Sequence, residues 1–99
     1  MLVFREPISF VWDRGYSEKS QRKHGVTHEE CEEVFFDPQK RMLRDALHSN
    51  GEERYIIIGA TKADRVLFMV FTIRKRMIRI ISARDLNRKE RHLYGKGAA

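Results

Sequence analysis

Three consecutive runs of β-branched and aromatic residues fill most of the second half of the chain and strongly limit the folds open to it. They span Arg54 to Ala60, Val66 to Arg74 and Met77 to Ala83. Such residues favour β-strands, and the short polar connections between the runs are typical of turns. The first two runs are apolar on both faces, as expected of central strands that helices cover on at least one side. We predict that the three strands follow one another in a meander.

The first half of the chain is predicted to contribute one short strand and two helices. Phe10 to Trp12 is the expected strand, and Asp13 can cap a polar surface helix from about Arg14 to His24. Gly25 would end that helix in the left-handed conformation, which glycine adopts without steric cost.

The second helix begins at a capping box, in which the side chains of Thr27 and Glu30 each accept a hydrogen bond from the other residue's amide. Pro38 ends the helix, because the residue before a proline is pushed out of the helical region. An apolar stripe at helical spacing is expected to face the core, and it consists of Cys31, Val34 and Phe35.

Two weaker elements complete the prediction. Lys40 to Asp45 is expected to form a further strand, and Asn87 with Glu90 forms a second capping box that opens a short helix from Arg88 to Tyr94. These elements add up to an α+β domain with two N-terminal helices, a largely antiparallel sheet of four to five strands and a short C-terminal helix. We expect residues 1–99 to form a single domain with flexible ends at 1–9 and 95–99.

The positive charge of the protein is concentrated in one stretch. Arg74 to Tyr94 holds eight Lys/Arg and two Asp/Glu, and its net charge of +6 equals the formal excess of the whole chain. A charge this concentrated favours an anionic partner, with a polyphosphate as the first candidate. A solvated basic face without a partner is the alternative, since basic residues also keep proteins soluble.

Composition argues against several other classes of protein. The single cysteine, Cys31, cannot form an internal disulfide, which favours a reducing cytoplasm. Arg5 and Pro7 interrupt any signal peptide, and the longest apolar run, Val66 to Thr72, is too short to cross a membrane. One cysteine and scattered histidines lack the spacing of zinc ligands, so we predict neither a metal site nor a cofactor.

Strand alternation distributes the arginines of the last strand over both faces of the sheet. Regular alternation places Arg76 and Arg84 on one face and Arg79 on the other, between apolar neighbours. Arg79 is either a structural arginine that pairs with a carboxylate such as Glu53, or a preorganised guanidinium aimed at a scissile phosphate.

Lys23 and His24 lie together at the predicted C-terminus of the first helix, where the helix dipole stabilises cations. His24 is either a cap for the last carbonyl groups or a general acid or base. A nuclease that works without a metal would need RNA, whose 2′-hydroxyl attacks the adjacent phosphate. Arginines and lysines would then stabilise the charge that develops on the pentacoordinate phosphate.

An ordered set of short motifs runs through the chain from Phe10 to Tyr94. The motifs are Phe10-x-Trp12-Asp13, Lys23-His24-Gly25-Val26, Glu29-Glu30, Val34-Phe35-x-Asp37-Pro38, Gly51-Glu52-Glu53-Arg54-Tyr55, Ile58-Gly59, Arg65, Ile78 to Arg84 and Glu90-Arg91. In these motifs and their order the chain resembles the BrnT family of toxins.

The resemblance implies a RelE-like fold and the activity of a ribonuclease toxin of type II toxin–antitoxin modules, which arrests translation. It also implies a BrnA-like antitoxin with a ribbon-helix-helix DNA-binding part. Two toxins and two antitoxins would form a heterotetramer that represses its own operon, and operator DNA would be contacted only through the antitoxin.

The resemblance also implies roles for individual residues. The catalytic set would be Lys23, His24, Arg79 and Arg84. The RNA-binding set would be Arg54, Arg65, Arg74, Arg76 and Arg88. The chain departs from the family pattern at Tyr16, Ser20 and Cys31, where lysine, asparagine and alanine are usual. The first two departures concern the chemistry of the first helix more than the fold.

Two other functions fit the same sequence. A non-catalytic module that binds nucleic acid or an operon-repressing partner would show the same isolated basic residues without a clear pairing of base and nucleophile. In the second alternative, the basic stretch serves chiefly as the docking surface for an acidic antitoxin. That function is compatible with a ribonuclease, because an inhibitor that covers the site neutralises it.

Overall fold

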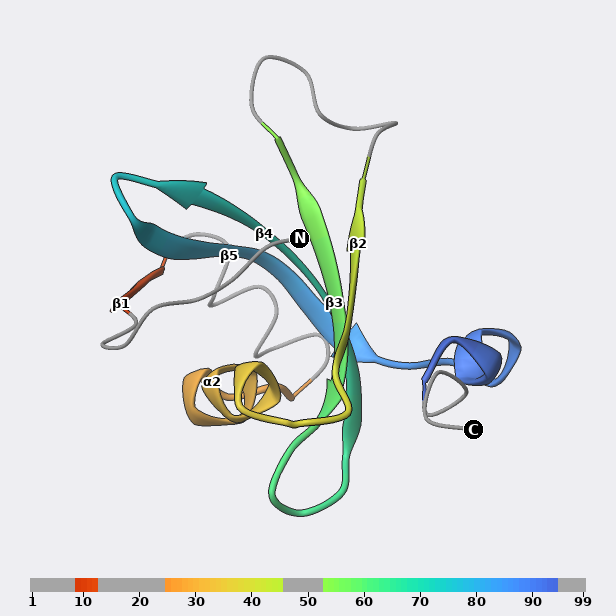
Figure 1. Ribbon diagram of the computed structural model, residues 1–99. Coiled ribbons are helices and arrows are strands. Elements are labelled where there is room, and N and C mark those ends of the chain that lie inside the picture. Colours follow the sequence, from red (N-terminus) through yellow and green to blue (C-terminus); the bar gives the residue numbers. More distant parts are fainter. Residues whose placement is uncertain (1–8, 13–24, 46–52, 95–99) are drawn as a thin grey trace.

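A computed structural model describes residues 9–12, 25–45 and 53–94 of the chain, and its central element is a five-stranded sheet (Figure 1). The strands lie in the order β1-β5-β4-β3-β2. They are β1 (Ser9–Trp12), β2 (Arg41–Arg44), β3 (Tyr55–Ala60), β4 (Val66–Arg74) and β5 (Met77–Asp85). Two helices accompany them, α2 (His28–Phe35) and the 3-10 helix η2 (Arg88–Leu93).

The predicted α+β class and meander are confirmed. Strands β2 to β5 pair antiparallel in sequence order, and β1 pairs parallel with β5, with Phe10 opposite Ile78. The C-terminal helix has 3-10 rather than α geometry. The predicted first helix, from about Arg14 to His24, and the terminal residues 1–8 and 95–99 lie outside the described residues.

The start of α2 follows the prediction closely. The Thr27 hydroxyl accepts a hydrogen bond from the Glu30 amide at 3.1 Å, and the Glu30 carboxylate accepts one from the Thr27 amide at 3.0 Å. Gly25, just before this cap, has a φ of +61°, the left-handed conformation expected there. Local sequence signals therefore determine where this helix begins.

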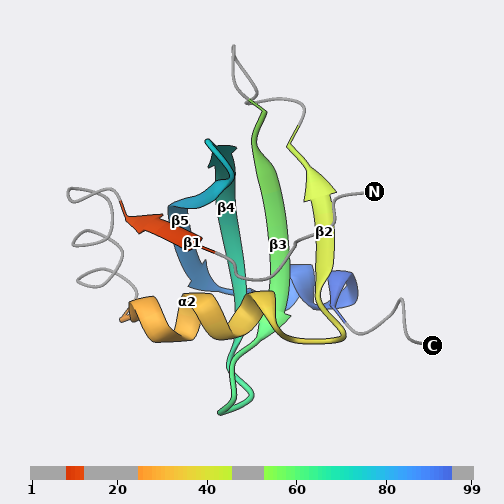
Figure 2. The same ribbon diagram turned by 60° about the vertical axis from the view of Figure 1, so that its left-hand side comes forward.

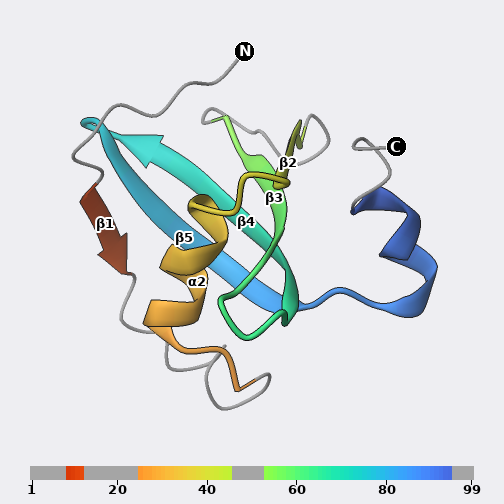
Figure 3. The same ribbon diagram turned by 60° about the horizontal axis from the view of Figure 1, so that its bottom comes forward.

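The main core lies between α2 and one face of the sheet (Figures 2 and 3). The predicted stripe of Cys31, Val34 and Phe35 is buried, and the Phe35 ring packs edge-on against Phe71 at 5.1 Å between centroids. Burial raises the pKa of the Cys31 thiol to about 12, so this cysteine serves as a small core residue. In Figure 2, η2 lies behind the sheet, on the side opposite α2.

Helix α2 packs directly against β3 at Gly59. A Cβ atom added there would lie 2.8 Å from the Cγ1 of Val34 and 3.1 Å from its carbonyl oxygen. The absence of a side chain therefore sets the distance between the helix and the sheet.

Gly59→Ala should lower the free energy of unfolding by about 1–2 kcal/mol, because the added methyl group overpacks this contact. Urea denaturation followed by circular dichroism measures the loss. Combining it with Val34→Ala, which removes the colliding methyl groups, should give a double variant more stable than the sum of the two single losses predicts. Simple additivity of the two losses would contradict the proposed steric cause.

Asp37, just after α2, connects three segments of the chain through hydrogen bonds. Its carboxylate accepts hydrogen bonds from the amides of Ala60 at 2.8 Å and Gln39 at 2.9 Å, and from the Tyr94 hydroxyl at 2.6 Å. Burial opposes ionisation of Asp37, but these hydrogen bonds outweigh it and hold its pKa below the usual value. Burial and the Asp37 carboxylate together raise the pKa of Tyr94 to about 12.

Acid should destabilise the protein through its anchored carboxylates. Asp37, Glu30 and Glu90 all have a pKa lowered in the folded state from ordinary values of 3.8 and 4.5. The unfolded chain therefore takes up protons first, and the free energy of unfolding should fall as the pH drops below about 4.5. The midpoint of urea denaturation, measured at several pH values between 3 and 7, follows this loss over the range in which carboxyl groups ordinarily take up protons. Tyr94→Phe should weaken the pH dependence, because it removes one of the hydrogen bonds that favour ionised Asp37.

Among the described residues, no helix combines the length and the apolar character needed to cross a membrane.

Candidate nucleic-acid interface

Strand β5 contains a β-bulge that changes which of its residues share a face. Its register with β4 skips Ile81, and the buried positions on either side, Ile80 and Ala83, are three residues apart instead of two. An extra residue in a strand reverses the alternation beyond it. The prediction that Arg79 and Arg84 lie on opposite faces is therefore wrong, because both lie on the side of the sheet away from α2.

We call this side the outer face. Its central part is formed by Phe68, Val70, Thr72 and Arg74 of β4 and by Arg79, Ser82 and Arg84 of β5. The surface alternates between cationic and apolar or hydroxyl side chains, a combination suited to a polyanion that carries flat bases.

Arg79 lies in the interior of the outer face, opposite Val11 of β1 and Thr72 of β4. Arg79 is half-buried, whereas Thr72 is fully buried. Within the described part of the chain, the Thr72 hydroxyl has no hydrogen-bond partner. Beside Arg79 there is thus a polar group that the described fold does not use.

Arg84 is held on the outer face by two contacts. Its guanidinium lies over the ring of Phe68, 4.2 Å from the centroid, and donates two hydrogen bonds of 2.8 Å to the carboxylate of Glu90. Glu90 also closes the predicted capping box with Asn87 at the start of η2. The ion pair raises the pKa of Arg84 and lowers that of Glu90.

Glu90→Ala should lower the free energy of unfolding by about 1–2 kcal/mol, because it removes both the cap of η2 and the partner of Arg84. Glu90→Gln should lose less, since glutamine also completes a capping box. Chemical denaturation compares the two variants. The toxicity that the resemblance to the BrnT family implies should persist in both variants below their melting temperatures, whereas a fully stable but inactive Glu90→Ala protein would contradict this structural role.

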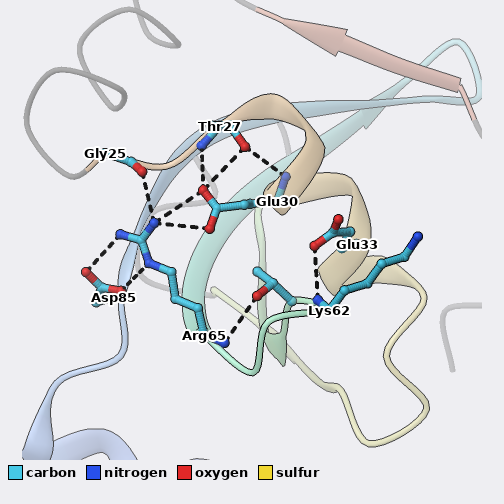
Figure 4. A network of polar contacts seen from close by, with 8 residues as sticks. Gly25, Thr27, Glu30, Glu33, Lys62, Arg65 and Asp85 are labelled. Atoms are coloured by element: carbon cyan, nitrogen blue, oxygen red, sulfur yellow. Dashed lines mark hydrogen bonds and ion pairs between the residues drawn. The ribbon is translucent and has the colours of Figure 1, made fainter.

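Arg65, between β3 and β4, joins three segments of the chain (Figure 4). Its guanidinium donates to Asp85 at 2.6 and 3.0 Å, to both carboxylate oxygens of Glu30 at 3.2 Å, and to the carbonyl oxygen of Gly25 at 2.9 Å. The bond to Asp85, opposed by burial and reinforced by Glu30, raises the pKa of Arg65. Arg65 is predicted to bind RNA, and these contacts show that its guanidinium also forms a clamp within the fold.

Three other predicted site residues precede β3 in the sequence. Lys23 and His24 lie outside the described residues, although Gly25 directly after them is bound by Arg65. Arg54 is half-buried just before β3, where its carbonyl oxygen accepts a hydrogen bond from the amide of Asp45.

The remaining predicted RNA-binding residues are exposed. Arg74 ends β4, Arg76 lies in the turn that follows, and Arg88 opens η2. Glu53, considered as a partner for Arg79, lies 2.8 Å from Arg44 instead and accepts a hydrogen bond from Tyr55 at 2.6 Å.

Three features of this face were not predicted from the sequence. The bulge at Ile81 has no signature in a strand of alternating type, and the stacking of Arg84 on Phe68 depends on the register that the bulge sets. The third feature, the pairing of Arg84 with Glu90, could have been predicted, since the capping box already placed Glu90 near the end of β5.

The described residues include no group of three or more His, Cys, Asp and Glu side chains arranged to hold a metal ion.

Comparison with known proteins places this architecture in a family. A family model described as the ribonuclease toxin BrnT of type II toxin–antitoxin systems matches residues 12–90. The chain belongs to the BrnT family. It is therefore a member of a family of ribonuclease toxins, and a type II module implies an antitoxin partner.

A solved structure agrees with this assignment at the level of the fold. The crystal structure of the Brucella abortus ribonuclease toxin BrnT aligns with a TM-score of 0.61 at 15% sequence identity. The alignment covers 82% of this chain and 99% of the Brucella chain. A search of curated protein sequences finds no significant match.

Proposed function

We propose that this BrnT chain is an endoribonuclease with a RelE-like fold, which cleaves RNA by metal-independent attack of the 2′-hydroxyl and thereby inhibits translation. The observation that carries the proposal is the outer face, where the bulge in β5 brings Arg79 and Arg84 onto one side of the sheet. The substrate supplies its own nucleophile in such a reaction. The protein needs chiefly to orient the phosphate and to stabilise its developing charge.

The arginines of the outer face differ in how they would serve that reaction. Arg84 lies over Phe68 and is paired with Glu90, so it would add to the positive potential of the face rather than contact the phosphate directly. Arg79, in the interior of the face, would contact the scissile phosphate. Lys23 would add a further cation and His24 would act as general acid or base; both directly precede Gly25 in the sequence, whose carbonyl oxygen Arg65 binds.

Cleavage of a defined RNA in excess EDTA tests this mechanism. The parent protein should cleave, and Arg79→Ala and Lys23→Ala, purified in parallel, should not. Tight and salt-sensitive RNA binding without cleavage would favour a binding module or an enzyme that acts only on the ribosome. Neither cleavage nor binding would leave an antitoxin interface as the explanation of the basic residues.

The antitoxin is proposed to be a BrnA-like protein with a ribbon-helix-helix part, in a heterotetramer of two toxins and two antitoxins that represses its own operon. The support is the family membership, together with the positive charge that an acidic inhibitor would cover. Light scattering of the co-expressed complex measures the stoichiometry. Operator DNA should be shifted by the complex and by the antitoxin, but not by the toxin alone.

A further inference from the structure

The turn between β4 and β5 has an unusual combination of geometry and sequence. Arg74 and Met77 pair across the hairpin, so only Lys75 and Arg76 form the connection. Both have positive φ, +49° for Lys75 and +65° for Arg76. Two central residues with positive φ define a type I′ turn, the two-residue connection that matches the twist of the strands.

Lys and Arg are poorly suited to this backbone. In the left-handed region the Cβ atom of an ordinary residue crowds the following carbonyl oxygen, and glycine or asparagine is therefore preferred. An Asn-Gly pair would make the same turn with less strain and would be equally polar. Solubility alone therefore does not account for two long cationic side chains at these positions.

The two side chains are also not used within the described fold. Both residues are exposed, and neither side chain has a hydrogen-bond or ion-pair partner among residues 9–12, 25–45 and 53–94. Strained backbone conformations cluster at functional sites, where the strain is part of the mechanism. Here the strained residues, Lys75 and Arg76, both carry a positive charge that is exposed to solvent.

The turn continues the cationic surface of the outer face. Arg74 precedes it at the end of β4, and Arg79 follows three residues after Arg76, a rise of ~10 Å along an extended strand. Figure 1 shows the turn at the end of the sheet opposite the connection between β3 and β4. A strand of RNA held at Arg79 would therefore pass the turn as it leaves the face in this direction.

We propose that Lys75 and Arg76 form an RNA subsite, which holds the phosphate backbone of the single-stranded substrate on one side of the cleaved bond. This inference rests on the proposed ribonuclease function and adds where the substrate runs. The subsite would provide affinity without sequence preference, because contacts to phosphates carry no sequence information.

Three double variants test the subsite. Lys75→Asn with Arg76→Gly removes both the charge and the strain, and Lys75→Gln with Arg76→Gln removes the charge alone. Lys40→Gln with Lys62→Gln is the control, since it removes two cations next to the start of β2 and the end of β3, at the end of the sheet opposite the turn. Binding of a labelled 2′-O-methyl oligoribonucleotide, which lacks the attacking hydroxyl, is measured as a function of salt. Thermal unfolding is measured in parallel.

Both turn variants should bind this RNA roughly tenfold more weakly near 0.1 M salt, with the slope of log K against log[salt] reduced by about 1.4. The control pair should bind nearly as the parent does. The Asn-Gly variant should also melt about 5 °C or more above the Gln-Gln variant, because the strain is relieved only in the former. A gain in stability together with a loss of RNA binding is the result that a purely structural turn would not produce.

Several results would overturn the subsite. An equal loss of RNA binding in the control pair would mean that the effect depends only on the net charge of the protein. Unchanged binding in the turn variants would mean that the RNA does not contact the turn, while the ribonuclease function would stand. Weaker binding of the antitoxin with unchanged RNA binding would assign the turn to the protein interface. A parent protein that neither binds nor cleaves RNA would remove the proposed function itself.

Discussion

Replacing Arg79 with alanine should abolish RNA cleavage and toxicity while the protein remains folded. Arg79 is a half-buried cation between β1 and β4 on the face that α2 leaves uncovered. Loss of one preorganised donor that stabilises a transition state typically lowers the rate by about 10²–10³-fold. The rate constant for cleavage of a defined RNA at saturating protein measures the effect, since it separates catalysis from binding.

Two further substitutions make the Arg79 result decisive. Arg44→Ala removes an arginine that also belongs to the sheet, but from the face covered by α2, and it should leave cleavage unchanged. Arg79→Lys retains the charge without the forked donor, and it should recover only part of the rate. If Arg79→Ala instead failed to fold, Arg79 would be a structural residue and the phosphate contact would have to be sought elsewhere on the outer face.

Replacing Arg65 with alanine should produce the largest loss of stability of any single change considered for this chain, about 3 kcal/mol. The substitution leaves Glu30 and Asp85 facing each other without their shared cation, and it frees the carbonyl group of Gly25. The side chain of Arg65 is only 27% exposed, so water replaces these hydrogen bonds incompletely. The melting temperature should fall by roughly 10–20 °C.

Arg65→Lys separates the charge from the geometry of the clamp. One ammonium group cannot reach both carboxylates and the Gly25 carbonyl, so this variant should recover less than half of the lost stability. If Arg65→Ala kept its melting temperature but bound RNA with a smaller salt dependence, Arg65 would belong to the RNA-binding surface, as its position in the family motif implied.

The order of elements could be predicted from the sequence because each has a strong local signal. The capping residues Thr27 and Glu30 fix where α2 begins, and β-branched runs fix β3, β4 and β5. Family membership was also within reach, because the motifs recur over the whole matched range of residues 12–90.

The arrangement of the site could not be predicted with the same rules. Alternation assigns faces correctly only in a regular strand, and the single unpaired residue Ile81 moves Arg84 to the side of Arg79. The partners of Arg65 come from α2 and from the end of β5, far apart in sequence, so no local pattern distinguishes this clamp from a cation that binds RNA. The face on which Arg84 lies and the contacts of Arg65 both depend on pairing between residues far apart in the sequence.

The parallel pairing of β1 with β5 has a consequence for when this toxin can become active during its own synthesis. Ser9 is synthesised well before its partner Met77, and Arg79 and Arg84 follow Met77. At ~5–20 residues per second, several seconds separate the two strands. The nascent chain therefore carries an incomplete sheet until β5 has been made. The outer face therefore forms only after β5 has been synthesised.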